Sequence, residues 1–137
     1  MASIRREVVI EASPEEVWDA VRDWGALHER LVPGFATGAR VEGDARVVTF
    51  FTGTVVTERI VTVDEAARRL VWTIVDGPYL HHNASAQVLE EPDGGARFVW
   101  LADVLPDAAA ERTAELMTRG TQIAKETLEG ARAEAGR

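Results

Sequence analysis

The chain contains no cysteine among its 137 residues, which excludes disulfides, thiolate metal sites, iron–sulfur clusters and cysteine nucleophiles. Basic residues are scarce as well, because 15 lysines and arginines stand against 23 aspartates and glutamates and give a formal net charge of −8. An acidic surface repels the phosphate backbones of nucleic acids. We therefore expect no nucleic-acid partner, and the missing cysteines agree with a reducing cytoplasm.

Long apolar runs are also missing. No window approaches the ~20 apolar residues of a membrane span, and the N-terminal residues 1–7 lack the apolar run of a signal peptide. We expect a cytoplasmic protein without a membrane span.

Motifs for metals, nucleotides and serine nucleophiles are absent too. Adjacent His81 and His82 point to opposite faces of a strand, and His28 lies in another element, so they do not form a metal site. The sequence has no glycine-rich phosphate loop between a strand and a helix and no Gly-x-Ser-x-Gly elbow. We expect no metal and no cofactor.

What the chain does have is enough apolar material for one domain over residues 1–137, with 46% hydrophobic residues. A protein of this size buries roughly two-thirds of the surface of its unfolded chain. That is enough to enclose a cavity as well as a core.

The N-terminal part predicts one strand followed by two short helices. Residues 4–12 alternate with a period of two, which is typical of a strand. Ser13 is a good N-cap, Pro14 suits the first helical position, and the acids that follow complement the helix dipole. A break at residues 24–25 separates this helix from a second one that ends near residues 33–34.

The remainder predicts six strands and one long helix. Turn signals of hairpin length separate the strand-like runs, so the sheet is expected to be antiparallel. The expected strands are 35–43, 45–53, 54–64, 69–76, 81–90 and 96–105. Residues from Asp107 to about Ala133 form an amphipathic helix with a stripe of Ala110, Ala114, Met117, Thr121, Ala124, Leu128 and Ala131. The fold class is α+β.

Side-chain parity indicates which residues face inward, since residues two apart on a strand share a face. The more apolar face carries Trp72 in strand 69–76, His82 in strand 81–90, and both Phe98 and Trp100 in strand 96–105. In strand 54–64 both faces are mixed, so hydrophobicity alone leaves the direction of Glu58 open.

The order of elements and several local motifs resemble the START-like helix-grip superfamily (SRPBCC), in particular its polyketide cyclase/dehydrase branch. The motifs are 12–18 (ASPEEVW), 58–60 (ERI) with Asp64 and 69–70 (RL), 77–78 (GP), 81–85 (HHNAS), and Trp100 before 103–107 (DVLPD). The resemblance implies a curved seven-stranded antiparallel sheet around a long C-terminal helix, with a cavity for hydrophobic small molecules. Some members cyclise, aromatise or dehydrate polyketide chains. The resemblance also favours an inward Glu58.

With Glu58 inward, the expected catalytic pair is His82 and Glu58, because a nearby carboxylate makes a histidine a natural general base. Tyr79 could donate to an enolate oxygen. The expected ligand-binding residues are Trp72, Tyr79, Phe98, Trp100, Met117, Gly120, Thr121 and Ala124. Residues 32–34 and 76–79 are expected at the mouth of the cavity, where they control access.

Simpler interpretations stay open. His82 could be a hydrogen-bonded core residue, Glu58 a structural partner, and the tryptophans a filled core. The leading function is binding of a hydrophobic small molecule, with polyketide cyclase, aromatase or dehydratase chemistry as its specific form. The alternatives are a non-catalytic carrier or sensor of a lipid or aromatic ligand, and an interaction module acting through its surface. The sequence leaves the oligomeric state open, a homodimer included.

Overall fold

The computed structural model describes residues 2–136. Its seven strands form one antiparallel sheet in the order β1-β7-β6-β5-β4-β3-β2. The strands are β1 (Ala2–Ile10), β2 (Ala36–Glu42), β3 (Ala45–Phe50), β4 (Val55–Asp64), β5 (Arg69–Ile74), β6 (His81–Glu90) and β7 (Ala96–Leu105). Except between β1 and β7, strands that adjoin in the sheet are consecutive in the chain. The antiparallel prediction is therefore confirmed.

Two short helices follow β1, as the sequence predicted. In α1 (Pro14–Arg22) the Ser13 side chain accepts a hydrogen bond from the backbone N–H of Glu16, and Pro14 occupies the first turn. A 3₁₀ turn (Trp24–Ala26) leads into α2 (Leu27–Arg30). Helix α1 packs against β6 and β7, and α2 packs against β2. The two helices thereby close one end of the sheet.

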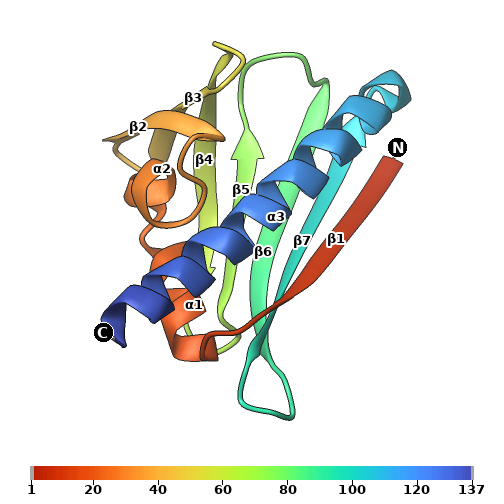
Figure 1. Cartoon of the computed structure of the whole chain (residues 1–137). Helices are drawn as coiled ribbons and strands as arrows, with labels where there is room; N and C mark the ends of the chain where they lie inside the picture. The colour runs from red at the N-terminus through yellow and green to blue at the C-terminus, as the bar shows by residue number, and fades with distance from the viewer. Residues whose placement is uncertain (1, 137) are drawn as a thin grey trace.

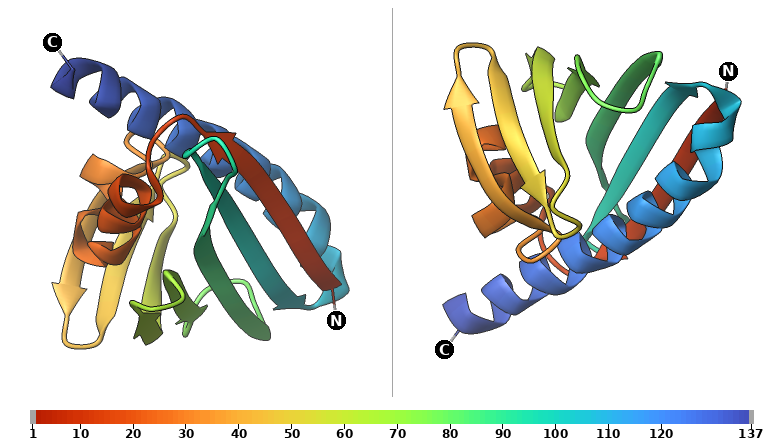
Figure 2. Two further views of the ribbon diagram at one scale, coloured as in Figure 1. Left: turned by 90° about the horizontal axis from the view of Figure 1, so that it is seen from below. Right: turned by 90° about the horizontal axis from the view of Figure 1, so that it is seen from above.

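The long C-terminal helix is α3 (Ala110–Ala135), preceded by a 3₁₀ turn (Asp107–Ala109). It runs diagonally across the sheet beside β1 (Figure 1), and two further views show the sheet bending around it (Figure 2). The residues that α3 buries are Thr113, Met117, Gly120, Thr121, Ala124 and Leu128. The expected stripe thus extends to Leu128, while Ala131 is exposed because the helix has by then passed beyond the sheet. This sheet wrapped around one long helix is the helix-grip architecture.

The predicted inward faces of the strands are confirmed. Trp72, His82 and Phe98 are buried, whereas His81, one residue from His82, is exposed. Glu58 is 5% exposed, so β4 turns its carboxylate inward together with Val56. A helix-grip fold with these side chains inside can hold a site between sheet and helix.

None of the helices within residues 2–136 combines the length and the apolar character that crossing a membrane requires.

Candidate functional site

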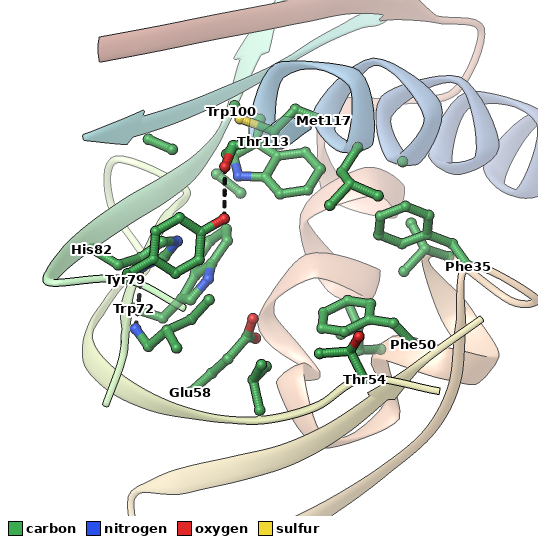
Figure 3. Close-up of a pocket in the computed structure, with 18 of the residues that line it drawn as sticks. Phe35, Phe50, Thr54, Glu58, Trp72, Tyr79, His82, Trp100, Thr113 and Met117 are labelled. Atoms are coloured by element: carbon green, nitrogen blue, oxygen red, sulfur yellow. Dashed lines mark hydrogen bonds between the residues drawn. The ribbon is translucent and has the colours of Figure 1, made fainter. Parts of the chain in front are cut away.

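A cavity of about 550 Å³ lies between the concave face of the sheet and α3. Its wall is mainly apolar and aromatic, with contributions from β3 to β7, from the short N-terminal helices and from α3 (Figure 3). The aromatic lining residues are Phe35, Phe50, Trp72, Tyr79, Phe98 and Trp100. The polar and charged lining residues are Arg46, Thr52, Thr54, Glu58, His82, Arg112 and Thr113.

The cavity brings together almost all residues that the sequence assigned to the site. Glu58, Trp72, Tyr79, His82, Phe98, Trp100, Met117, Gly120 and Ala124 all line it. Thr121 does not belong to the lining; it is buried, and its hydroxyl donates to the carbonyl oxygen of Met117 at 2.6 Å. Whether the lining residues contact a ligand stays a prediction.

Trp72 and Trp100 stand on neighbouring parts of the wall, with their rings 6.2 Å apart and tilted by 46°. Gly120 of α3 lies directly over this wall. A Cβ atom at this position would come within 2.9 Å of Trp100 Cζ3, so the glycine allows the helix to approach the indole closely. Close packing against Trp100 and Phe35, rather than open space for a ligand, therefore explains Gly120.

Glu58 is held by Arg46, a lining residue that the sequence analysis did not name. The two residues are directly opposite each other on β3 and β4, and Arg46 Nε donates to Glu58 Oε1 at 2.7 Å. Arg46 also donates to the carbonyl oxygen of Trp24 at 3.1 Å and lies over the Trp72 ring. Parity in 45–50 could have indicated Arg46, because it shares a face with Val48 and Phe50.

Among the described residues no hydrogen bond joins His82 to Glu58, the two residues of the expected catalytic pair. The register places Ile74 opposite Glu58, and Ile74 donates its backbone N–H to His82 Nδ1 at 3.1 Å. Ile74 therefore lies between the two side chains, which come from β4 and β6 with β5 in the middle. Strands are about 4.8 Å apart, so about 10 Å separates the two backbones. Both polar groups face the cavity, but each has its own partner.

Burial, together with the neighbouring His81, lowers the pKa of His82 from 6.5 to about 4. The ring is therefore neutral near pH 7. The backbone carbonyl oxygen of His82 accepts a hydrogen bond from the Thr73 hydroxyl, which fixes the backbone beside the ring. A neutral imidazole of such low pKa is a weak proton acceptor, which differs from the basic histidine that the sequence suggested.

Tyr79 connects the segment between β5 and β6 to α3. Its hydroxyl lies 2.7 Å from Thr113 Oγ1, and Thr113 itself donates to the carbonyl oxygen of Ala109 at 2.8 Å. Because a threonine hydroxyl has one proton, Tyr79 is the donor in this pair. The sequence suggested that Tyr79 could donate to an enolate oxygen of a ligand. In the structure its proton is instead engaged with Thr113.

Both segments expected at the mouth border the cavity. Val32 contributes from residues 32–34, and Pro78 and Tyr79 contribute from residues 76–79. Control of access by these segments stays a prediction.

A bent antiparallel sheet that encloses a largely apolar cavity against a long C-terminal helix defines a helix-grip protein with an internal pocket. The family model described as "Polyketide cyclase / dehydrase and lipid transport" matches residues 1–135. The chain belongs to this family.

Solved structures share this fold. A Bacillus thuringiensis protein superposes with a TM-score of 0.83 at 17% identity, over 93% of this chain and 98% of that chain. A Thermobifida fusca protein solved by NMR has a TM-score of 0.76 at 29% identity, over 96% and 93% of the two chains. The di-domain ARO/CYC BexL from the BE-7585A biosynthetic pathway has a TM-score of 0.78 at 19% identity, over 94% of this chain and 47% of BexL. No curated protein sequence matches the chain.

Proposed function

We propose that the protein binds a hydrophobic small molecule in the cavity between the sheet and α3. The observation that carries this proposal is the cavity itself, whose volume of about 550 Å³ lies within the usual range of ligand sites. Its wall is mostly apolar and aromatic, with a few polar groups at separate places. Such a wall supplies affinity through burial of apolar surface, and the polar groups orient the ligand.

The family description supports this proposal, since it names cyclases, dehydrases and lipid transport together. These activities share a hydrophobic ligand and differ in whether it is converted. Non-catalytic carriage of a lipid or aromatic molecule is the simpler form.

A second candidate is cyclisation, aromatisation or dehydration of a polyketide-like substrate, and the charged and titratable groups inside the cavity favour it. Glu58 and His82 both face the space that a substrate would occupy. Formation of an enolate next to a ketone needs a group that takes the proton and a donor to the developing oxyanion. The similarity to the di-domain ARO/CYC BexL supports this candidate in fold, over about half of that protein.

Native mass spectrometry of freshly purified protein tests binding directly. We expect a population heavier than the 15.0 kDa chain, and we expect the extra mass to disappear on denaturation. The chemical class of the released molecule then indicates which substrates to use in turnover assays. If the protein carries no small molecule and takes up no apolar probe when one is added, the binding proposal is wrong.

A further inference from the structure

The hydrogen bond at His82 Nδ1 determines where the imidazole carries its proton. Ile74 donates its backbone N–H to this nitrogen at 3.1 Å. A backbone amide can only donate, so Nδ1 must be unprotonated. A neutral ring has one N–H, and it therefore lies on Nε2.

Nε2 is the ring nitrogen left for an occupant of the cavity. His82 lines the cavity and is 7% exposed. Within residues 2–136 no hydrogen bond involves Nε2. The Tyr79 ring packs beside the imidazole with a centroid distance of 5.1 Å, and its hydroxyl points to Thr113 instead (Figure 3).

A second donor without an acceptor lies on the same side of the cavity. Trp100 Nε1 is fully buried and has no hydrogen-bond partner among the described residues. Trp100 is on β7, the strand next to β6, which carries His82. Because this atom is closed off from the cavity space, the donor that a ligand can reach at this wall is the Nε2–H of His82.

We infer that His82 donates its Nε2–H to a carbonyl-type oxygen of the ligand and thereby selects hydrophobic molecules that carry such an oxygen. This inference rests on the proposed binding function and adds to it the polar group that the ligand must present. A ligand with only hydrocarbon beside β6 would leave the His82 Nε2–H unpaired.

The inference changes the role that the sequence suggested for His82. A nitrogen that already holds a proton cannot accept another from a substrate without giving an imidazolium ion. The low pKa of His82 makes that ion unfavourable in this buried position. In a cyclase reaction His82 would stabilise the enolate oxygen, and the proton would pass to another group, for which the Glu58 carboxylate is the acceptor inside the cavity.

The first experiment measures the tautomer in the free protein. Long-range ¹H–¹⁵N NMR spectra of the imidazoles at pH 7 distinguish a protonated from an unprotonated ring nitrogen. We expect His82 to show a protonated Nε2 and an unprotonated Nδ1. A protonated Nδ1, or a doubly protonated ring, would overturn the inference whatever the protein binds.

The second experiment compares two probes of the same shape, 2-acetylnaphthalene and 2-isopropenylnaphthalene, which differ in C=O against C=CH₂. We expect the ketone to bind about fivefold more tightly, the effect of one hydrogen bond between neutral groups, after correction for the different water solubility of the probes. Equal corrected affinities would overturn the inference and leave the binding function standing. Binding of neither probe, by a protein that also carries no small molecule after purification, would reject both.

Two variants separate the donor from the fold. In His82→Asn the shorter amide can still accept a hydrogen bond from the Ile74 N–H, but it does not reach the position of Nε2. The ketone and the alkene should therefore bind this variant about equally. In His82→Gln the longer amide places a donor near Nε2, and the preference should persist. His81→Asn is the matched control on the exposed face and should behave as the parent protein. Persistence of the preference in His82→Asn would contradict the role of His82.

Discussion

Arg46 and Glu58 form an ion pair whose side chains are 3% and 7% exposed. Removing one partner of such a pair leaves an uncompensated buried charge, which commonly costs about 3–5 kcal/mol. We expect Arg46→Met and Glu58→Met each to lower the free energy of unfolding by about 3 kcal/mol. The double variant should lose clearly less than the sum, because neither charge is then left alone.

Urea unfolding of the two single variants and the double variant measures this coupling. The exposed pair of Arg22 and Glu65, at 2.9 Å, is the matched control, and Arg22→Met should change stability by less than about 1 kcal/mol. Strict additivity at Arg46 and Glu58 would show that the buried pair is not coupled as the structure indicates.

His82 makes stability depend on pH in a defined direction. Its pKa is lowered to about 4 in the folded state against 6.5 in the unfolded chain, mainly through burial. The unfolded state therefore binds more protons between these values. The contribution of the neutral ring is complete above pH 6.5 and is lost as the pH falls towards 4, by about 3 kcal/mol in total.

Measuring the free energy of unfolding between pH 7 and pH 4 for the parent and for His82→Asn isolates this contribution, because the carboxylates are common to both. The parent should lose about 3 kcal/mol more than the variant over this interval. Parallel pH profiles would mean that His82 titrates as it does in the unfolded chain.

At the scale of single residues, the sequence predicted which side chains face inward but not which groups they would contact. Parity on 81–90 placed His82 inside, and the resemblance placed Glu58 inside. The partners depend on register, which brings Arg46 opposite Glu58 and Ile74 between Glu58 and His82. Parity is a property of one strand, whereas register is decided between strands, so a single sequence pattern does not contain it.

At the scale of elements, α3 contains two glycines that make a matched comparison. Gly120 faces Trp100, where an added Cβ would lie 2.9 Å from Cζ3, whereas an added Cβ at Gly130 would have no atom within 4 Å. Alanine is favoured over glycine inside a helix by about 1 kcal/mol. Gly130→Ala should therefore stabilise the protein by up to this amount.

Gly120→Ala should instead lower stability and displace the Trp100 indole, because the contact with the aromatic ring outweighs the gain in helix propensity. Thermal unfolding and the indole N–H resonance of Trp100 report the two effects. If Gly120→Ala stabilised the protein as much as Gly130→Ala, with the indole resonance unmoved, α3 would not approach the sheet as closely as the structure shows.

The hydrogen bond between Tyr79 and Thr113 joins the segment after β5 to α3 beside the cavity. We expect Tyr79→Phe to speed amide exchange in residues 76–80 by about threefold to tenfold, the opening that the loss of one hydrogen bond allows. Thr113 retains its bond to Ala109, so the fold should persist. Hydrogen-exchange mass spectrometry measures the effect.

Thr113→Val removes the same bond from the helix side and should give the same acceleration. Faster exchange in only one of the two variants, or in neither, would show that this hydrogen bond does not hold residues 76–80 against α3.

At the scale of the whole molecule, the sequence allowed the fold to be predicted because its signals are local. Ser13 and Pro14 mark the start of α1, period-two alternation marks the strands, and hairpin-length links make them antiparallel. The cavity could be expected only in outline. Its volume depends on how strongly the sheet bends and on how closely α3 packs at Gly120, and neither is encoded in a short window of sequence.

The claim that the cavity holds a hydrophobic ligand is tested most directly by the four tryptophans. Trp72 and Trp100 line the cavity, whereas Trp18 and Trp24 are not among its described lining residues. An NMR titration with 2-acetylnaphthalene follows the four indole N–H resonances, assigned by single Trp→Phe variants. We predict saturable, one-site shifts for Trp72 and Trp100 and little change for Trp18 and Trp24. Shifts that do not saturate, or that appear at Trp18 and Trp24 while Trp72 and Trp100 stay unchanged, would contradict ligand binding in this cavity.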